Sequence, residues 1–182
     1  MDQYSTITRR NLLRIALLGA AQSGTAYAQW PWTRKALTWE EVNTLIERKF
    51  PGTPKISTTQ LAVWLDDGKP TLLLDVRQRA EFEVSQIRGA RFAPDDSAIS
   101  ILASQAKDTR VVVYCSVGYR SAQIVLKLRS LGYSNAFNCE GSLFQWANEG
   151  RPVFQGQKAA RLVHPYDAHW GTLLQEVLRA PL

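Results

Sequence analysis

Cysteine, histidine and methionine are scarce in this chain of 182 residues, which holds two, two and one of them. Two cysteines cannot build a disulfide framework, and a chain of this length needs none. The two histidines, His164 and His169, lie near one carboxylate, Asp167, and that set is too small for a zinc site. We expect no metal and no organic cofactor, and assign both histidines to the surface packing of a C-terminal tail.

Long apolar runs and clusters of one charge are also missing. No apolar stretch reaches the ~20 residues that a helix needs to cross a bilayer, so no stable membrane span is expected. The formal net charge is +6, of which residues 1–28 supply +2, from three arginines against one aspartate. The remaining excess of +4 is modest and unclustered, which argues against a nucleic-acid partner and suits a small anionic substrate.

The first 28 residues have the three parts of an export signal. Arg9 and Arg10 precede a short apolar run over residues 15–21, and the segment ends in Ala26-Tyr27-Ala28. A basic start, an apolar middle and an A-x-A site form a secretory signal, and the adjacent arginines resemble the bacterial twin-arginine signal. We predict cleavage after Ala28 and a periplasmic mature chain; the alternative is a basic helix that stays in the cytosol or on a membrane.

The rest of the chain divides into three parts: an N-terminal helical extension over residues 29–55, a main domain over residues 56–155 and a C-terminal extension over residues 156–182. In the first part, Thr38 and Glu41 form a capping-box pattern, which predicts a helix that runs up to Pro51. In the last part we expect a short closing helix over residues 173–178, and Pro152 is expected to end the main unit.

The main domain alternates between strand and helix patterns. Apolar runs at residues 71–76 and 111–114 are uninterrupted, as in strands buried on both faces of a parallel sheet. Weaker strands are predicted at residues 89–92 and 136–139, and helices at residues 58–65, 79–84, 98–106, 121–131 and 141–149. This alternation predicts an α/β sandwich, a central parallel sheet flanked by helices. Ligands of such sheets bind at the carboxyl ends of strands, where Asp75 and Cys115 fall.

Cys115 follows the predicted strand at residues 111–114 and opens a loop that leads into a helix. The loop reads Cys115-Ser116-Val117-Gly118-Tyr119-Arg120. Backbone N–H groups of such a turn and the positive end of the helix dipole favour a bound anion. The same field favours thiolate over thiol. Arg120 adds a positive charge that either faces the entering anion or ties the loop to a carboxylate. These residues predict a nucleophilic thiol inside an anion site.

Six pieces of sequence occur in a fixed order through the main domain: Leu72–Arg77, Glu81-Phe82, Ile87–Ala90, Val111–Ser121, Glu140–Trp146 and Gly150–Val153. This ordered set resembles the single-domain rhodaneses, the thiosulfate-type sulfurtransferases, over roughly residues 55–155. The resemblance implies a rhodanese-like sandwich and a reaction in which Cys115 takes up a sulfane sulfur as a persulfide and passes it on.

Further expectations rest on that resemblance. Thiosulfate or a persulfide would be the donor, and a thiol or cyanide the acceptor. The substrate anion would be held by Ser116, Val117, Gly118, Tyr119 and Arg120. The six-residue loop suits sulfur, because related phosphatases of this fold have a loop one residue longer. Two rivals stay open: a non-catalytic sulfur carrier or binding module that docks a partner protein, and a phosphatase or arsenate reductase.

Several neighbouring residues receive supporting roles. We interpret Asp75, Arg77 and Glu81 as a structural ion-pair cluster under the loop, in preference to a catalytic charge set. Tyr119 is expected to form the wall of the pocket. Cys139 is expected to be structural, and a disulfide to Cys115 is left open. Two positions depart from the family pattern: Gln86, where many members carry histidine, and Ser142, where many carry glycine.

Overall fold

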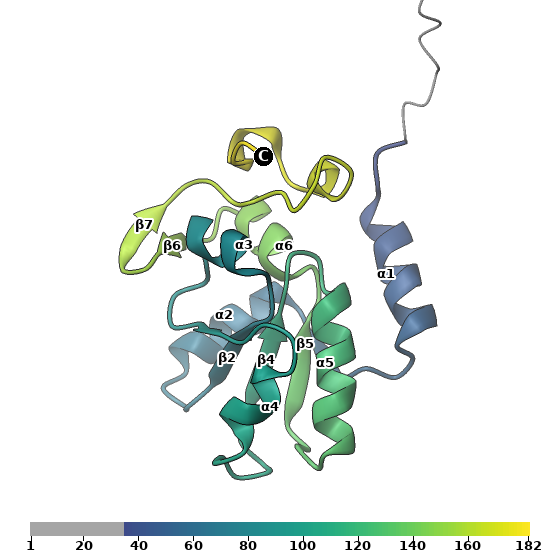
Figure 1. Ribbon diagram of the computed structural model, residues 1–182, viewed down its shortest axis with the longest axis vertical. Coiled ribbons are helices and arrows are strands. Elements are labelled where there is room, and N and C mark those ends of the chain that lie inside the picture. The colour runs from purple at the N-terminus through teal and green to yellow at the C-terminus, as the bar shows by residue number, and fades with distance from the viewer. Residues whose placement is uncertain (1–34) are drawn as a thin grey trace, which may run out of the picture. The chain divides into compact units, whose positions relative to one another are not determined.

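The computed structural model describes residues 35–182 (Figure 1). The export signal predicted over residues 1–28 lies outside the described residues, and its cleavage stays a prediction. Among the described helices, none combines the length and the apolar character that crossing a membrane requires.

In the described part of the chain, five parallel strands form the central sheet, in the order β1-β5-β4-β2-β3. Their bounds are β1 (Lys55–Ile56), β2 (Leu72–Asp75), β3 (Arg91–Phe92), β4 (Val111–Tyr114) and β5 (Ala136–Cys139). All four residues of the middle strand β4 are buried, as its uninterrupted apolar run predicts. The carboxyl ends of parallel strands meet at one edge of the sheet, which brings Asp75 and Cys115 together there. The predicted α/β sandwich is confirmed.

Within residues 35–182, six α-helices surround the sheet: α1 (Trp39–Lys49), α2 (Thr58–Asp66), α3 (Arg79–Val84), α4 (Ser97–Leu102), α5 (Tyr119–Ser130) and α6 (Ser142–Asn148). Side chains alternate between the two faces of a strand, so β4 contributes to two core clusters. Val112 and Tyr114 pack with residues of α2 and α6, and Val111 and Val113 pack with residues of α4 and α5. The sheet is therefore covered on both faces.

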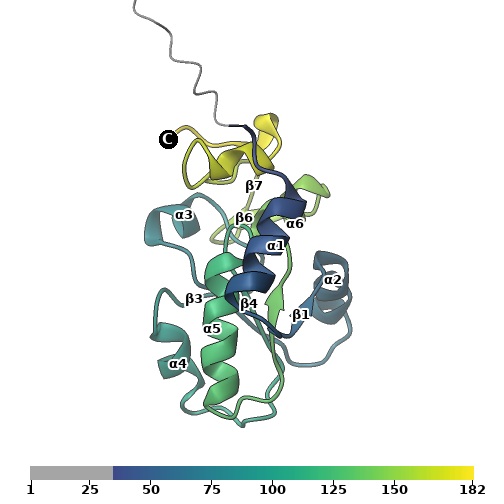
Figure 2. The same ribbon diagram turned by 90° about the vertical axis from the view of Figure 1, so that its right-hand side faces the viewer.

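Helix α1 begins as its sequence predicts. The Thr38 side chain accepts from the Glu41 N–H at 3.2 Å, and the Glu41 carboxylate accepts from the Thr38 N–H at 2.9 Å, which completes the capping box. Val42 and Ile46, one turn apart, are the buried residues of α1 and join the core cluster that contains Tyr114. The helix runs beside α5 (Figure 2).

The sequence-based bounds of two helices were wrong. The helix predicted at residues 98–106 is α4, which ends at Leu102, and the helix predicted at residues 121–131 is α5, which already begins at Tyr119. Helix α5 starts early because Gly118 has a left-handed φ of 104°, a conformation that costs glycine little. This turns the chain sharply and places Tyr119 and Arg120 in the first helical turn.

The C-terminal part of the chain differs most from the sequence-based expectation. After Pro152 the chain forms an unpredicted antiparallel hairpin, β6 (Val153–Gln155) and β7 (Lys158–Ala160). The closing helix predicted at residues 173–178 is wrong: two short 3-10 turns, η1 (Trp170–Leu173) and η2 (Glu176–Leu178), replace it. The Asn148 side chain donates to the Leu173 carbonyl and accepts from the Gln175 N–H, at 2.8 and 2.9 Å. These backbone groups thus form hydrogen bonds with the last residue of α6 instead of with one another in a continuous helix.

Candidate active site

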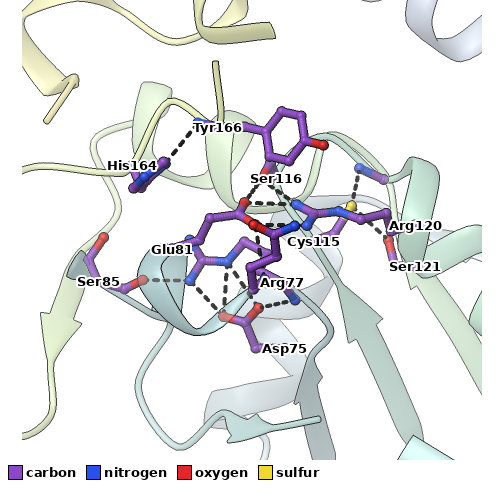
Figure 3. A network of polar contacts seen from close by, with 12 residues as sticks. Asp75, Arg77, Glu81, Ser85, Cys115, Ser116, Arg120, Ser121, His164 and Tyr166 are labelled. Carbon is purple, nitrogen blue, oxygen red and sulfur yellow. Dashed lines mark hydrogen bonds and ion pairs between the residues drawn. The ribbon is translucent and has the colours of Figure 1, made fainter. Parts of the chain in front are cut away.

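Cys115 lies at the bottom of the loop that joins β4 to α5, and its side chain is buried. Its Sγ accepts from the Gly118 N–H at 3.2 Å and from the Ser121 hydroxyl at 3.5 Å (Figure 3). The left-handed Gly118 folds the loop back far enough for the first of these contacts. The loop therefore curls around the sulfur and directs donors toward it.

The carbonyl groups of the loop are bonded to neighbouring elements. Leu143 and Phe144, in the first turn of α6, donate N–H groups to the carbonyls of Cys115 and Ser116, at 3.1 and 2.9 Å. The Asn138 side-chain amide, from β5, donates to the Gly118 carbonyl at 3.1 Å. A trans peptide holds C=O and N–H in opposite directions, so fixing these carbonyls fixes the direction of the N–H groups that follow. Sequence analysis missed Asn138, although a polar residue inside an apolar strand was a visible signal.

Arg120 ties the loop to a carboxylate, one of the two roles considered for it. Its guanidinium donates to both carboxylate oxygens of Glu81, at 2.7 and 2.8 Å, and to the Ser116 hydroxyl at 3.0 Å. Ser116 in turn donates to Glu81 at 2.7 Å. Glu81 is the N3 residue of α3, where its carboxylate accepts from the Gln78 N–H. The start of α3 and the loop before α5 are thus joined by one carboxylate.

Three charged or polar groups shift the pKa of Cys115. Burial acts to raise that pKa, but the positive charge of Arg120 and hydrogen bonds from Ser121 and Gly118 act against burial and prevail. The net effect is a pKa below the ordinary thiol value, so the thiolate persists to lower pH than it would on an exposed cysteine. The pKa of Glu81 is also lowered, because hydrogen bonds and the charge of Arg120 outweigh its burial.

Removing the charge of Arg120 should slow the reaction of Cys115 with an alkylating agent. Because the thiolate is the nucleophile, we expect Arg120→Met to react with iodoacetamide roughly tenfold more slowly at neutral pH, with its rate midpoint moved to higher pH. Arg120→Lys keeps the charge and serves as the matched control, with a midpoint close to that of the unaltered protein. A midpoint that is the same in Arg120→Met would contradict the electrostatic role of Arg120.

Asp75 and Arg77 form a separate buried ion pair below the loop. The Asp75 carboxylate accepts from the Arg77 backbone N–H at 3.0 Å and from Nε and Nη2 of its guanidinium, at 2.9 and 2.7 Å. Nη2 also donates to the Ser85 carbonyl at 2.6 Å. Both residues of the pair have 0% exposure and neither lines the cavity above Cys115. The structure thus divides the predicted charge cluster: Asp75 pairs with Arg77, and Glu81 with Arg120.

Ser142, which replaces the frequent glycine, contacts the backbone of both cysteines. Its hydroxyl accepts from the Cys115 N–H at 3.2 Å and donates to the Cys139 carbonyl at 2.8 Å. Ser142 adopts a φ of 48°, in the left-handed region that disfavours residues with a side chain. The hydroxyl thus gains two buried hydrogen bonds at the cost of some backbone strain.

Two substitutions of Ser142 should separate these opposing effects. Ser142→Ala keeps the strain and leaves the buried Cys115 N–H without its acceptor, which we expect to lower the free energy of unfolding by about 2 kcal/mol. Ser142→Gly loses the same hydrogen bonds but relieves strain, so it should be less destabilising by about 1 kcal/mol. Urea unfolding of both variants measures the difference. Equal stability of the two would show that the positive φ is not strained.

Cys139 is fully buried, and burial raises its pKa to about 12. Both cysteines are free. Cys139 packs in the cluster of Val112 and Tyr114, whereas Cys115 packs with Val111 and Val113. The two thiols therefore belong to opposite faces of the sheet, and a disulfide would require the end of β4 to rearrange.

The cavity above Cys115 has a volume of about 250 Å³. Of the residues predicted to hold substrate, Ser116, Val117, Tyr119 and Arg120 line it. Gly118 is not among the lining residues and acts through its N–H to the sulfur.

Two further lining residues, Tyr166 and Trp170, come from the C-terminal segment, which lies over α3 and α6 in Figures 1 and 2. Sequence analysis missed both, because it assigned the neighbouring His164 and His169 to the surface packing of a C-terminal tail. Within the same segment, His164 Nδ1 accepts a hydrogen bond from the Tyr166 N–H at 3.0 Å.

Gln86, the other departure from the family pattern, does not line the cavity. Its backbone N–H and C=O pair with Phe154 of β6, at 2.7 and 2.8 Å. Among the residues from 35 onward, no group of three or more His, Cys, Asp or Glu side chains is arranged to hold a metal ion.

Known proteins resemble the main domain in sequence. The rhodanese-like domain family matches residues 57–149. A protein named sulfurtransferase from Allochromatium vinosum is 32% identical over 99 residues, which cover 54% of this chain and 92% of that protein. The probable adenylyltransferase/sulfurtransferase MoeZ of Mycobacterium tuberculosis is 33% identical over 99 residues, but this chain spans only 25% of its length.

Solved structures show the same fold. The solution structure of a rhodanese-like domain from Anabaena is 28% identical with a TM-score of 0.51, and the match covers 56% of this chain and 78% of that domain. A thiosulfate sulfurtransferase from Pseudomonas aeruginosa, at 21% identity and a TM-score of 0.57, shares the fold over 66% of this chain and 23% of its own. Because the family model matches more than half of this chain, the chain belongs to the rhodanese-like domain family.

Proposed function

We propose that the protein is a sulfurtransferase in which Cys115 carries the transferred sulfur as a persulfide. One observation carries the proposal: the Cys115 sulfur lies at the bottom of a cavity and accepts hydrogen bonds from Gly118 and Ser121. These donors favour an anionic sulfur at this position. The similarity to the Allochromatium vinosum protein named sulfurtransferase supports the same reaction class.

Two displacements at sulfur make up the proposed cycle. In the first, the Cys115 thiolate attacks the outer sulfur of thiosulfate or of a persulfide, and sulfite or a thiolate leaves with the electron pair of the broken S–S bond. In the second, an acceptor thiolate or cyanide attacks the outer sulfur of the Cys115 persulfide and restores the Cys115 thiolate. The N–H groups of the loop hold the negative charge of the persulfide between the two steps.

Mass spectrometry of the full-length protein tests the loading step. The reduced protein is mixed with thiosulfate or with a low-molecular-weight persulfide, alkylated and digested. We expect the peptide that contains Cys115 to gain one sulfur, about 32 mass units, and the peptide that contains Cys139 to gain none, because its thiol stays protonated and buried. If no donor adds sulfur to Cys115, the proposed function is wrong.

A second measurement distinguishes an enzyme from a non-catalytic sulfur carrier, which is the alternative function. Loaded protein is given cyanide and an excess of donor, and thiocyanate is followed over time. An enzyme makes many equivalents of thiocyanate per Cys115, whereas a carrier that depends on a partner protein releases about one or fewer.

We also propose that the protein acts in the periplasm. This rests on the twin-arginine pattern at Arg9 and Arg10 and on the site ending at Ala28. The intact mass of protein recovered from the periplasm should correspond to a chain that begins at Gln29. A mass that includes residues 1–28 would contradict cleavage.

A further inference from the structure

The cavity above Cys115 carries little positive charge for a site that takes an anion. Arg120 is the one charged residue among the described residues that line it, and both carboxylate oxygens of Glu81 accept from its guanidinium. The Glu81 side chain is 1% exposed and that of Arg120 30%. With Cys115 as thiolate, these three groups sum to one negative charge. This net charge would therefore repel a dianion such as thiosulfate more strongly than a monoanion.

Aromatic side chains form much of the remaining wall. Tyr119 is the first residue of α5, and Tyr166 and Trp170 come from the C-terminal segment. The Tyr166 ring centre lies 5.0 Å from the Arg120 guanidinium carbon (Figure 3), and the ring of Tyr119 packs edge-on against Phe50 at 5.0 Å. The Arg120 guanidinium is thus paired with the Glu81 carboxylate and stacked against the Tyr166 ring. The aromatic rings present an apolar surface to an entering molecule.

Hydrogen bonds within the C-terminal segment hold Tyr166 and Trp170 in place at the cavity wall. The Asp167 carboxylate accepts from the N–H groups of His169 and Trp170, at 2.8 and 2.7 Å. Tyr166 has a φ of 67°, a strained conformation for a residue with a side chain, and its N–H donates to His164. Strained backbone persists where its surroundings fix it, which is common at ligand sites. The two rings are therefore positioned before any substrate arrives.

We infer that this cavity selects sulfur donors that carry one negative charge and a small apolar organic group over the inorganic dianion thiosulfate, and that Tyr166 and Trp170 determine this selectivity. The inference rests on the proposed function, because it names the donor class of the same site. The cavity volume of about 250 Å³ lies below the ~300–1,000 Å³ of sites for drug-sized ligands, which fits an alkyl or single aryl group.

An organic persulfide, R–S–SH, belongs to this class because it ionises to the monoanion R–S–S⁻, and it is attacked in its protonated form. The Cys115 thiolate attacks its outer sulfur, the S–S bond of the donor breaks, and the electron pair leaves on R–S⁻. The proton of the transferred SH group then passes to R–S⁻. The products are the Cys115 persulfide anion and R–SH, so atoms, charge and electrons balance without an added oxidant or reductant.

Three donors that differ in charge and in organic group test the selectivity. Thiosulfate is a dianion, methanethiosulfonate is a small monoanion and benzenethiosulfonate is an aromatic monoanion; each transfers its outer sulfur. Their kcat/KM values are measured on the full-length protein with cyanide as acceptor and divided by their rates with a free small thiol, which removes differences in intrinsic reactivity. We expect benzenethiosulfonate to exceed thiosulfate by about tenfold or more, with methanethiosulfonate between them.

Variants of the wall decide whether Tyr166 and Trp170 cause the preference. Tyr166→Gly, which accepts a positive φ, and Trp170→Ala should each lower the benzenethiosulfonate-to-thiosulfate ratio by roughly five- to tenfold. Tyr166→Phe should keep it. Val177→Ala, at a position 63% exposed in the same segment, is the control and should also keep it. Thermal unfolding verifies that each variant is folded.

The outcomes separate this inference from the proposed function. A normalised ratio at or below one in the unaltered protein, or a ratio unchanged in both Tyr166→Gly and Trp170→Ala, would overturn the inference while leaving the proposed function intact. Thiocyanate no faster than with Cys115→Ser, for all three donors, would overturn both.

Discussion

Replacing Cys115 by serine is expected to reduce sulfur transfer to the uncatalysed background, a loss of at least about a thousandfold. A serine hydroxyl stays protonated in the field that makes the Cys115 thiolate, and it cannot form the S–S bond of a persulfide. The hydrogen bonds from Gly118 and Ser121 that now reach Sγ can still be accepted by a hydroxyl oxygen, so the variant should fold. Thiocyanate formation and the gain of sulfur mass at position 115 are the two measurements.

Cys139→Ala is the matched control for that experiment. Cys139 packs on the other face of the sheet and its thiol stays protonated, because burial raises its pKa to about 12. The alanine variant should therefore keep transfer activity, although it loses about 1 kcal/mol of stability from the missing buried sulfur. Activity that disappears in Cys139→Ala but survives in Cys115→Ser would contradict the assignment of Cys115 as nucleophile.

Replacing Asp75 by alanine is expected to destabilise the fold by about 3–5 kcal/mol, because it leaves a buried guanidinium without its carboxylate. Arg77 has 0% exposure and cannot turn its charge toward solvent without opening the core. Much of the stability of a domain of this size would be lost. Urea unfolding gives the free energy of unfolding from its midpoint and slope.

An exposed ion pair of equal length provides the control. Lys127 and Asp96 also approach to 2.7 Å, but their side chains are 46% and 72% exposed. Asp96→Ala should cost less than about 1 kcal/mol. In the double variant Asp75→Leu/Arg77→Met no charge is left buried alone, so it should be more stable than Asp75→Ala. Equal losses in Asp75→Ala and Asp96→Ala would contradict the buried-charge argument.

The central strands of the sheet could be predicted because their signals are local, whereas the two-residue edge strand β1 (Lys55–Ile56) was missed. The predicted strands at residues 111–114 and 136–139 and the helix at residues 79–84 match β4, β5 and α3 residue for residue. Continuous apolar runs and a capping pattern are properties of a few adjacent residues. The position of Cys115 in its loop followed from the same signals, since a strand and a helix on either side define the turn between them.

The C-terminal part could not be predicted because its partners are distant in sequence. Asn148 of α6 bonds to the backbone of Leu173 and Gln175 and so replaces the expected helix with two 3-10 turns. Tyr166 and Trp170 reach the loop after β4 only through the path of the folded chain. Whether Arg120 faced an anion or a carboxylate depended on the position of Glu81, which lies on another helix. Side-chain pairing between distant elements leaves no periodic pattern in the sequence.

The placement of the two thiols on opposite faces of the sheet also determines how this protein responds to oxidants. A peroxide that converts the Cys115 thiolate to a sulfenic acid creates a group that a neighbouring thiol would normally capture as a disulfide. Cys139 cannot do so without rearrangement of the strand end, and the chain has no third cysteine. Recovery then depends on a thiol from solution that enters the same aromatic-walled cavity, and without one a second peroxide oxidises the sulfenic acid to the irreversible sulfinic acid. Protection of the nucleophile and the proposed selection of the sulfur donor therefore depend on one opening.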